Sequence, residues 1–269
     1  MVRRVQRLDV ELVRRSLARS REHAVELIAA GRVQVRGVTA TKAATGVERE
    51  TAVRVRDDLD DPGYVSRGGH KLAGALAAFA PIAVDGRRCL DAGASTGGFC
   101  DVLLRGGAAH VVAVDVGYGQ LAWSIASDHR VEVVDRTNVR TLTPDAIGGP
   151  VELTVADLSF ISLGLVLPAL AACTEPDGDL LPMVKPQFEV GKERLGPGGV
   201  VRDRQLRAVA VIGVSETAAT LGWLTAGVCR SPLPGPAGNV EFFLWLRRVV
   251  PQPLDPDEIA RIVTSTEAL

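Results

Sequence analysis

A glycine-rich turn between a short apolar run and a helical pattern constrains this chain more than any other feature. Residues 89–92 read as a buried strand, residues 93–98 form the turn, and a helical pattern follows. Gly93, Gly97 and Gly98 can adopt positive φ angles and, without a Cβ, let a ligand approach the backbone closely. The helix that follows directs its first amides toward the same point. This pattern predicts part of an α/β sheet with a ligand at its strand ends.

A second apolar run ends in an acidic residue about 20 residues after the turn, the spacing typical of nucleoside-binding folds. Residues 110–114 read as a strand and Asp115 follows them. A carboxylate in this place accepts ribose hydroxyls. The turn lacks the Gly-Lys-Ser/Thr ending of a P-loop, and Ser95 stands where the dinucleotide fingerprint has glycine. S-adenosylmethionine (SAM), which has no phosphate, therefore fits better, and a tight turn without a ligand is the alternative.

Strand and helix signals alternate through most of the remaining chain. Seven strand signals, the early ones separated by helices, predict a doubly wound, Rossmann-like α/β sheet. The strands are expected at residues 89–92, 111–115, 131–134, 151–156, 180–184, 224–229 and 240–246, and helices at 72–79, 101–104, 120–126, 161–173 and 205–221.

The first 60 residues read as a separate small α+β module. Two short helical patterns, the second capped by Ser20 and ending at Gly31, precede alternating strand patterns near residues 33–36 and 53–55. Residues 1–56 carry a net charge of +7, which leaves −8 for the rest of the chain. Such asymmetry favours a basic module for an anionic polymer, with a solvated basic face as the alternative. We expect this module at residues 1–60, a linker at 61–65 and the sheet domain at 66–269.

Several classes of protein are not expected. The four cysteines form no Cys-x-x-Cys pair and the histidines are scattered, so neither a metal site nor a disulfide framework is predicted. No apolar segment follows the first methionine as in a signal peptide. The longest apolar run, residues 160–173, is too short to span a bilayer and contains Pro168. The sequence predicts a cytoplasmic monomer that binds neither membrane nor metal.

Four charged residues stand where a binding crevice is expected. Asp157 ends the fourth strand signal, Lys185 ends the fifth, and Glu241 opens the last. Lys71 stands just before the helix that precedes the sheet. Any one of them alone would more often be a structural ion pair, but the four together favour an active site.

Two resemblances give these patterns a function. The run Arg7-Leu8-Asp9, Leu12, Ser20-Arg21, Gly31 and Val33 resembles the S4 RNA-binding domain, and the order Lys-Asp-Lys-Glu is like the tetrad of SAM-dependent ribose 2′-O-methyltransferases. Together with residues 66–72, 91–99, 156–162 and 185–189, the chain resembles the TlyA family of ribosomal RNA cytidine-2′-O-methyltransferases, some of which carry the name haemolysin. The resemblance implies SAM-dependent methylation of cytidine ribose in 16S or 23S ribosomal RNA, or both, within ribosomal subunits. An RNA-binding assembly protein with an inactive fold and, further off, a membrane-active haemolysin are the alternatives.

The resemblance also implies roles for individual residues. A 2′-hydroxyl must lose a proton, so Lys185 is expected as general base and Lys71 as its positive neighbour, while Asp157 and Glu241 orient them; which lysine takes the proton stays open. The loop at residues 191–199 is a candidate lid. The expected cofactor-binding residues are Gly93, Ala94, Ser95, Thr96, Gly97, Gly98, Phe99, Asp115, Asn138 and Asp157. The expected RNA-binding residues are Arg7, Arg14, Arg15, Arg19, Arg21, Arg36 and Arg67.

Overall fold

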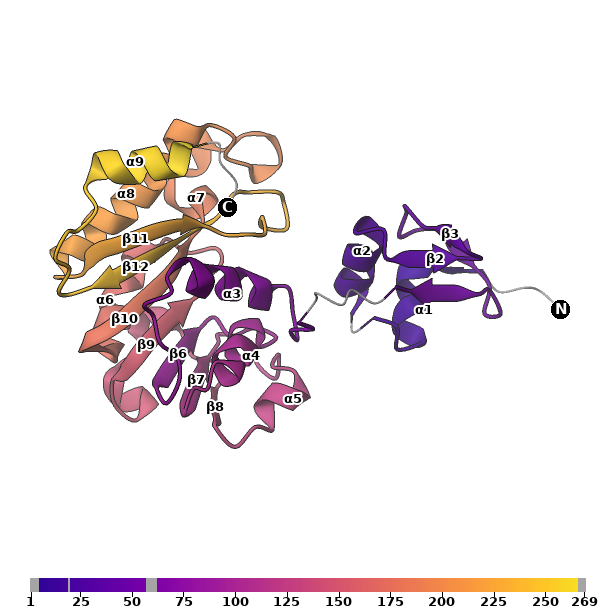
Figure 1. Ribbon diagram of the computed structural model, residues 1–269, viewed down its shortest axis with the longest axis horizontal. Helices are drawn as coiled ribbons and strands as arrows, with labels where there is room; N and C mark the ends of the chain where they lie inside the picture. The colour runs from indigo at the N-terminus through magenta and orange to yellow at the C-terminus, as the bar shows by residue number, and fades with distance from the viewer. Residues whose placement is uncertain (1–4, 19, 57–61, 266–269) are drawn as a thin grey trace. The chain divides into compact units, whose positions relative to one another are not determined.

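The chain divides into two compact units, residues 1–63 and residues 64–269 (Figure 1). The computed structural model describes residues 5–18, 20–56 and 62–265. Each unit has its own hydrophobic core, so each is described by itself.

The first unit packs two helices against short strands. Its helices are α1 (Leu8–Arg14) and α2 (Arg21–Ala29); β3 (Val38–Thr39), β2 (Val33–Val35) and β5 (Val53–Val55) form one sheet, and β1 (Gln6–Arg7) pairs with β4 (Gly46–Val47). The Ser20 side chain accepts a hydrogen bond from the His23 amide, which confirms the predicted cap. The first helix ends earlier than its apolar spacing suggests, because Ser16 turns the backbone to φ 57°. Leu8, Leu12 and Val33 are among the fully buried core residues.

The second unit is built on the predicted seven-stranded sheet, with strand order β11-β12-β10-β9-β6-β7-β8. The pairs that join β10, β9, β6, β7 and β8 are parallel, whereas β12 runs antiparallel to both of its neighbours. The strands are β6 (Arg88–Ala92), β7 (His110–Val114), β8 (Val131–Val134), β9 (Val151–Ala156), β10 (Thr174–Val184), β11 (Leu224–Arg230) and β12 (Phe242–Arg247). This is the doubly wound α/β class that the alternating signals predict.

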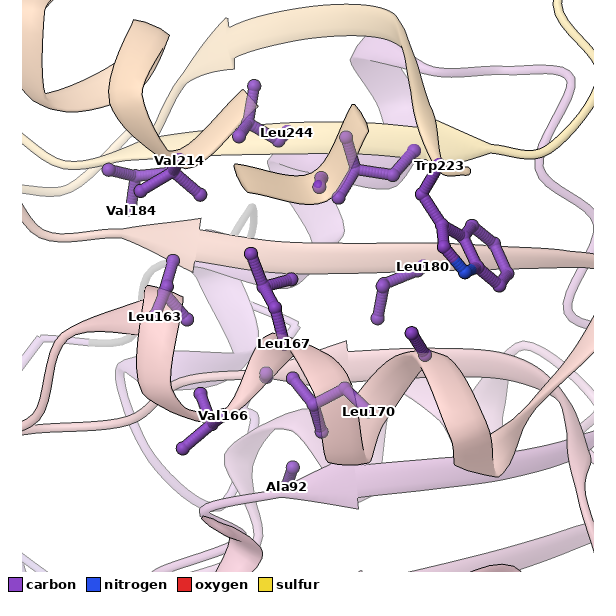
Figure 2. Packing of buried hydrophobic residues seen from close by; sticks show 14 of the residues in the cluster. Ala92, Leu163, Val166, Leu167, Leu170, Leu180, Val184, Val214, Trp223 and Leu244 are labelled. Atoms are coloured by element: carbon purple, nitrogen blue, oxygen red, sulfur yellow. The ribbon is translucent and has the colours of Figure 1, made fainter. Parts of the chain in front are cut away.

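Helices cover both faces of this sheet (Figure 1). On one face α3 (Gly68–Ala78), α4 (Gly98–Arg105) and α5 (Trp123–Ala126) contribute to one core, and on the other α6 (Leu167–Cys173), α8 (Arg204–Thr220) and α9 (Pro256–Thr264) contribute to the larger one. Figure 2 shows Leu167 and Leu170 of α6 packed in the larger core with Leu180 of β10. Neighbouring strand residues face opposite cores, as Cys89 and Leu90 do, which explains why the strands read as unbroken apolar runs.

Several boundaries differ from those expected. The predicted helix at 161–173 is a 3-10 turn, η3 (Leu163–Leu165), followed by α6, and α9 was not anticipated. Lys71 lies inside α3 rather than before it, because the helix already begins at Gly68. Glu241 immediately precedes β12 instead of opening it. The remaining short elements are α7 (Pro186–Glu189), η1 (Val139–Thr141), η2 (Pro144–Ile147), η4 (Lys192–Arg194) and η5 (Pro197–Gly199).

Candidate active site

The glycine turn and Asp157 lie at the point where the strand order reverses. From β6 the chain adds β7 and β8 on one side of the sheet and then returns to place β9 on the other. The segments that leave the carboxyl ends of β6 and β9 therefore turn to opposite faces of the sheet, toward α4 and α6, and open α/β sheets bind ligands in the crevice at such a point. The Asp157 amide donates to the Ala92 carbonyl at 3.1 Å. A Cβ on Gly93 would lie 2.6 Å from the Asp157 carbonyl, so only glycine fits between the two strand ends.

The Asp115 side chain, which follows the neighbouring strand β7, stabilises the glycine turn by hydrogen bonds. Its Oδ2 accepts a hydrogen bond from the Ser95 amide at 2.8 Å, and its Oδ1 accepts one from the Gly117 amide at 2.7 Å. Ser95 has φ 47°, a conformation unusual for a residue other than glycine. The carboxylate thus holds a strained backbone in place, a role that the sequence did not suggest, and each oxygen keeps a second lone pair for a ligand.

The other predicted cofactor residues divide into exposed and buried groups. Ser95 and Thr96 are exposed on the turn, while Ala94, Gly97, Gly98 and Phe99 are buried beneath it. The Phe99 ring packs against Phe243 in the core at a centroid distance of 6.0 Å. Asn138 is exposed and its side chain caps η1 by accepting from the Arg140 amide at 3.0 Å, the turn function typical of asparagine.

Asp91 belongs to the 91–99 pattern but was not among the predicted site residues; it is a fully buried carboxyl group in β6, next but one before Gly93. The Cys100 thiol donates to its Oδ2 at 3.0 Å, and its Oδ1 has no hydrogen-bond partner among the described residues. Burial raises the pKa of Asp91 to about 7, and the nearby carboxylates of Asp157 and Asp115 act in the same direction. An acidic residue within an apolar strand that leads into a glycine turn was the signal available for finding it.

Lys71 and Glu241 form a buried ion pair. The Lys71 Nζ donates to Glu241 Oε2 at 2.5 Å, and the two side chains are only 6% and 1% exposed. The lysine comes from α3, and the glutamate precedes β12. Removing both charges from water costs free energy, and this cost is offset only when the two charges pair with each other. The fold therefore requires both partners.

Lys185 and Asp157 form a second ion pair at the same edge. The Lys185 Nζ lies 2.6 Å from Asp157 Oδ1 and donates to Ser159 Oγ at 2.9 Å. The sheet register pairs Val184 of β10 with Phe242 of β12. Lys185 follows Val184 and Glu241 precedes Phe242, so the two residues lie side by side at the ends of neighbouring strands. The predicted catalytic residues therefore form two ion pairs, both at the carboxyl edge of the parallel strands.

Two aromatic residues follow these charged residues. Phe160 is 92% exposed at φ 63°, and its ring lies 5.3 Å from that of Phe188. Glu189 links the segment after β10 to the segment after β9. Its carboxylate accepts hydrogen bonds from Ser162 Oγ at 2.6 Å and from the Leu163 amide at 2.9 Å. A large aromatic side chain held exposed in a strained conformation is a candidate for a functional contact. The sequence pattern gave no role to either ring.

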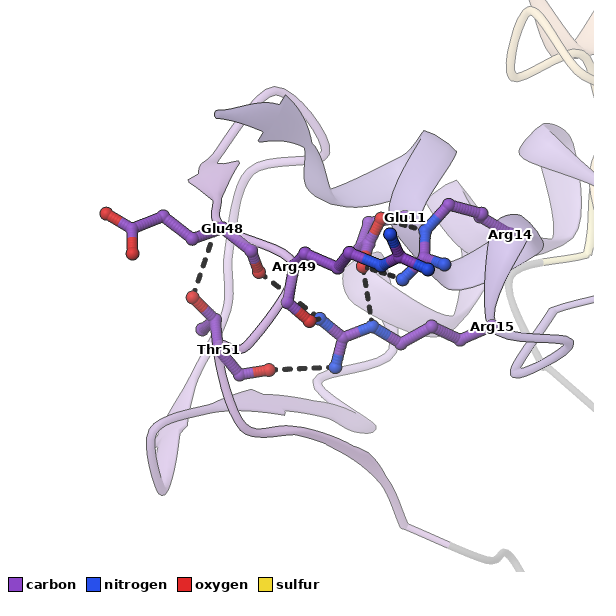
Figure 3. Close-up of polar contacts among 6 residues, drawn as sticks. All are labelled: Glu11, Arg14, Arg15, Glu48, Arg49 and Thr51. Atoms are coloured by element: carbon purple, nitrogen blue, oxygen red, sulfur yellow. Dashed lines mark hydrogen bonds and ion pairs between the residues drawn. The ribbon is translucent and has the colours of Figure 1, made fainter. Parts of the chain in front are cut away.

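The arginines expected to bind RNA lie in varied surroundings. Arg14 and Arg15 both bind the Glu11 carboxylate, and Arg15 also donates to the carbonyls of Arg49 and Thr51 (Figure 3). Arg7 and Arg21 both bind the buried Asp9. These arginines hold the pKa of Asp9 and of Glu11 at about 2.

The remaining three arginines lie elsewhere. Arg36 is exposed at φ 52° between β2 and β3, and Arg19 lies outside the described residues. Arg67, in the second unit, donates to the Pro234 carbonyl at 2.6 Å.

Among the described residues there is neither a candidate metal site nor a candidate membrane-spanning helix. No group of three or more histidine, cysteine, aspartate or glutamate side chains in ranges 5–18, 20–56 and 62–265 could hold a metal ion. Within the same ranges, no helix is both long enough and apolar enough to cross a membrane.

Comparisons with known proteins place both units in families. Residues 64–248 match the FtsJ-like methyltransferase model and residues 6–53 match the S4 domain model. The chain is 65% identical over 247 residues to the 16S/23S rRNA (cytidine-2′-O)-methyltransferase TlyA of Mycobacterium tuberculosis, covering 92% of this chain and 91% of that protein. It is 41% identical to YqxC of Bacillus subtilis, described as a candidate rRNA methyltransferase, over 98% of this chain and 94% of the relative.

A solved structure supports the same relationship. A Streptococcus thermophilus protein described as a candidate hemolysin has a TM-score of 0.77 to this chain at 37% identity, covering 96% of this chain and 94% of that one. The chain therefore belongs to the TlyA family, in which an S4 domain precedes an FtsJ-like methyltransferase domain.

Proposed function

We propose that this protein uses SAM to methylate the 2′-hydroxyl of a cytidine ribose in ribosomal RNA within ribosomal subunits. The main support is that two ion pairs, Lys71–Glu241 and Lys185–Asp157, lie at the sheet edge that carries the glycine turn. The 65% identical relative from Mycobacterium tuberculosis is named for this reaction. Because ribosomal subunits are the proposed substrate, we assign the protein to the cytoplasm.

The residues at the crevice fit SAM. Ser95 and Thr96 are exposed on the turn where the methionine part would lie, and Asp115 offers free lone pairs to the ribose hydroxyls. The unpartnered Asp91 oxygen beneath the turn suits the positive charges of this cofactor. When bound, SAM supplies a methyl group that is already strongly electrophilic. The protein therefore has to align the 2′-oxygen and remove one proton.

Lys185 is the group we assign to proton removal. Its short contact with Asp157 holds the ammonium charge in the free enzyme. When RNA excludes water from the edge, desolvation disfavours both charges, and the proton can move from Nζ to Oδ1. This leaves a neutral amine that can accept the proton of the 2′-hydroxyl. After the methylated RNA leaves and water returns to the edge, Asp157, which is 22% exposed in the free protein, can release its proton to solvent.

Lys71 and the aromatic pair position the nucleotide. Lys71 is fixed by Glu241 and adds a positive charge beside the developing alkoxide, which stabilises it electrostatically. Phe160 and Phe188 present aromatic faces next to Lys185, where an unstacked base can stack as RNA-binding proteins commonly arrange. The S4 unit adds affinity for structured RNA.

The direct test is transfer of a radiolabelled methyl group from SAM to purified small and large ribosomal subunits. The label is expected at the 2′-oxygen of a cytidine, because the proposed site positions a hydroxyl group and removes its proton. Incorporation on a base, or no incorporation into either subunit while SAM still binds, would contradict the proposal. The second result would favour an RNA-binding protein with an inactive methyltransferase fold.

A further inference from the structure

Arginines from two segments, residues 202–207 and the end of β11, gather at the sheet edge that carries Glu241. Arg202 lies just before α8, Arg204 and Arg207 lie in its first turn, and Arg230 is the last residue of β11. The body of the protein, residues 57–269, has a net charge of −8, so a basic cluster here is a local exception.

Hydrogen bonds fix the segment that bears Arg202. The Val201 amide donates to Asn239 Oδ1 at 2.9 Å, and the Val201 carbonyl accepts from Arg207 Nε at 2.8 Å. Asn239 is only 2% exposed, and its Nδ2 donates to the Gly199 carbonyl at 3.0 Å. Because Asn239 is two residues from Glu241, this amide ties the end of the loop that follows Lys185 to the strand entry beside the active site.

Arg230 reaches the same edge from the antiparallel hairpin. It pairs with Phe242, the first residue of β12, and the next amide, that of Ser231, donates to the Glu241 carbonyl at 2.9 Å. The backbone of Arg230 therefore lies directly beside the strand position that Glu241 precedes.

The cluster has too few counter-charges. Among the described residues no carboxylate lies within ion-pair distance of Arg202, Arg207 or Arg230, unlike the arginines that Asp9 and Glu11 hold in the first unit. The Asp203 carboxylate is used to cap α8, where it accepts from two backbone amides. Burial lowers the pKa of Arg207, the charges of Arg230 and Arg204 lower it further, and Asp203 opposes them with the smallest effect. Four like charges near a single carboxylate repel one another, which an anionic ligand would relieve.

We propose that Arg202, Arg204, Arg207 and Arg230 bind the phosphodiester backbone of the substrate RNA next to the target nucleotide. The inference rests on the proposed function and assigns the methyltransferase unit its own RNA contact, in addition to the S4 unit. Guanidinium groups bind phosphate oxygens through paired hydrogen bonds. Such contacts fix the position of the RNA without reading its sequence.

The test compares charge removal at this edge with charge removal at the far end of the β11–β12 hairpin. Arg202→Gln/Arg230→Gln removes two exposed cationic side chains for which the described residues give no side-chain hydrogen bond, so folding is retained. Arg248→Gln, just beyond the far end of β12, is the control. Binding to ribosomal subunits and methyl transfer are measured over a range of salt concentrations, together with SAM titration and thermal melting.

The double variant is expected to weaken subunit binding about tenfold or more and to reduce the salt slope by about two, one for each lost phosphate contact. SAM affinity and melting temperature should match the wild type, and Arg230→Lys should retain most of the slope. A slope and KM equal to those of Arg248→Gln would overturn the inference. The proposed function would still stand in that case, provided that the wild-type protein methylates ribosomal RNA. If the wild-type protein does not methylate ribosomal RNA, the proposed function itself is refuted, whatever the arginine variants show.

Discussion

Lys71 Nζ and Glu241 Oε2 lie 2.5 Å apart although 170 residues separate them in the chain. The pair joins α3, on one face of the sheet, to the entry of β12 within it. Removal of either partner would leave the other group buried without its counter-charge, so each side chain depends on the other.

Removing one partner of this pair should cost more than removing both. Glu241→Ala is expected to lower the free energy of unfolding by about 3–5 kcal/mol, because it leaves a buried charge unpaired. Lys71→Met combined with Glu241→Leu removes both charges and should recover much of that loss, yet remain inactive. Urea denaturation followed by tryptophan fluorescence measures this unit alone, because all three tryptophans lie in it. A double variant as unstable as the single one would show that the charges do not depend on each other.

Asp115→Ala should weaken SAM binding without abolishing the fold. The carboxylate fixes Ser95 and Gly117 and, in the proposed site, accepts ribose hydroxyls. Hydrogen bonds to a charged group contribute about 1.5–3 kcal/mol, so the dissociation constant should rise roughly ten- to a hundredfold. Calorimetric SAM titration is the measurement, and Glu132→Gln, an exposed acidic change on β8, is the matched control. Equal affinities for the two variants would remove Asp115 from the cofactor site.

The first unit should be sensitive to acid. Asp9 and Glu11 have folded-state pKa values of about 2, below their usual 3.8 and 4.5. Their contribution to stability is therefore complete above about pH 4.5 and is lost as the pH falls toward 2. Hydrogen exchange of amides in α1 and α2 should accelerate over this range.

Glu11→Gln provides the comparison for that pH dependence. It should exchange faster than the wild type at pH 7, since Arg14 and Arg15 lose their shared carboxylate, and should change less between pH 4.5 and 2. An unchanged exchange rate at pH 7 would show that these arginines are not held structurally. They would then be available for RNA, as the charge pattern alone predicts.

Phe160 should matter for the RNA substrate and not for stability. Phe160→Asn places at φ 63° a residue that tolerates this conformation and removes a ring that is 92% exposed, so the melting temperature should stay the same or rise. Methyl transfer should fall and SAM affinity should not change, while Phe160→Trp should retain most activity because it keeps a stacking face. Wild-type turnover by Phe160→Asn would show that the exposed ring does not contact the substrate.

Features encoded locally were predictable from sequence. The glycine turn, the Ser20 cap and the charged residues at strand ends each depend on neighbours in the chain, and the structure has them in those positions. The first residues of helices were harder to predict, because Gly68 and Gly69, which begin α3, read as loop residues in the sequence. At Gly69 the requirement for glycine comes from packing, because a Cβ there would lie 2.5 Å from the Tyr64 side chain.

Features that depend on tertiary pairing were not predictable. A count of basic residues finds a positive first unit, but it cannot show that Asp9 and Glu11 each hold two arginines. Hydropathy marks Phe160 as a core residue, whereas the positive φ turns it outward. The burial of Asp91 and the pairing of Lys71 with Glu241 likewise follow from strands and helices that are distant in the chain.

The central claim is that Lys185 removes the proton of the 2′-hydroxyl, and Lys185→Arg tests it most directly. Arginine keeps the charge beside Asp157 but cannot release its proton in the accessible pH range. The measurement is the single-turnover rate of methyl transfer to ribosomal subunits, with SAM affinity measured in parallel. The rate should fall by about 10²–10⁴, as expected for loss of a general base, while SAM affinity stays at the wild-type value. A Lys185→Arg rate above about a tenth of the wild-type rate would contradict this role and leave Lys185 as a positioning charge, with Lys71 as the base.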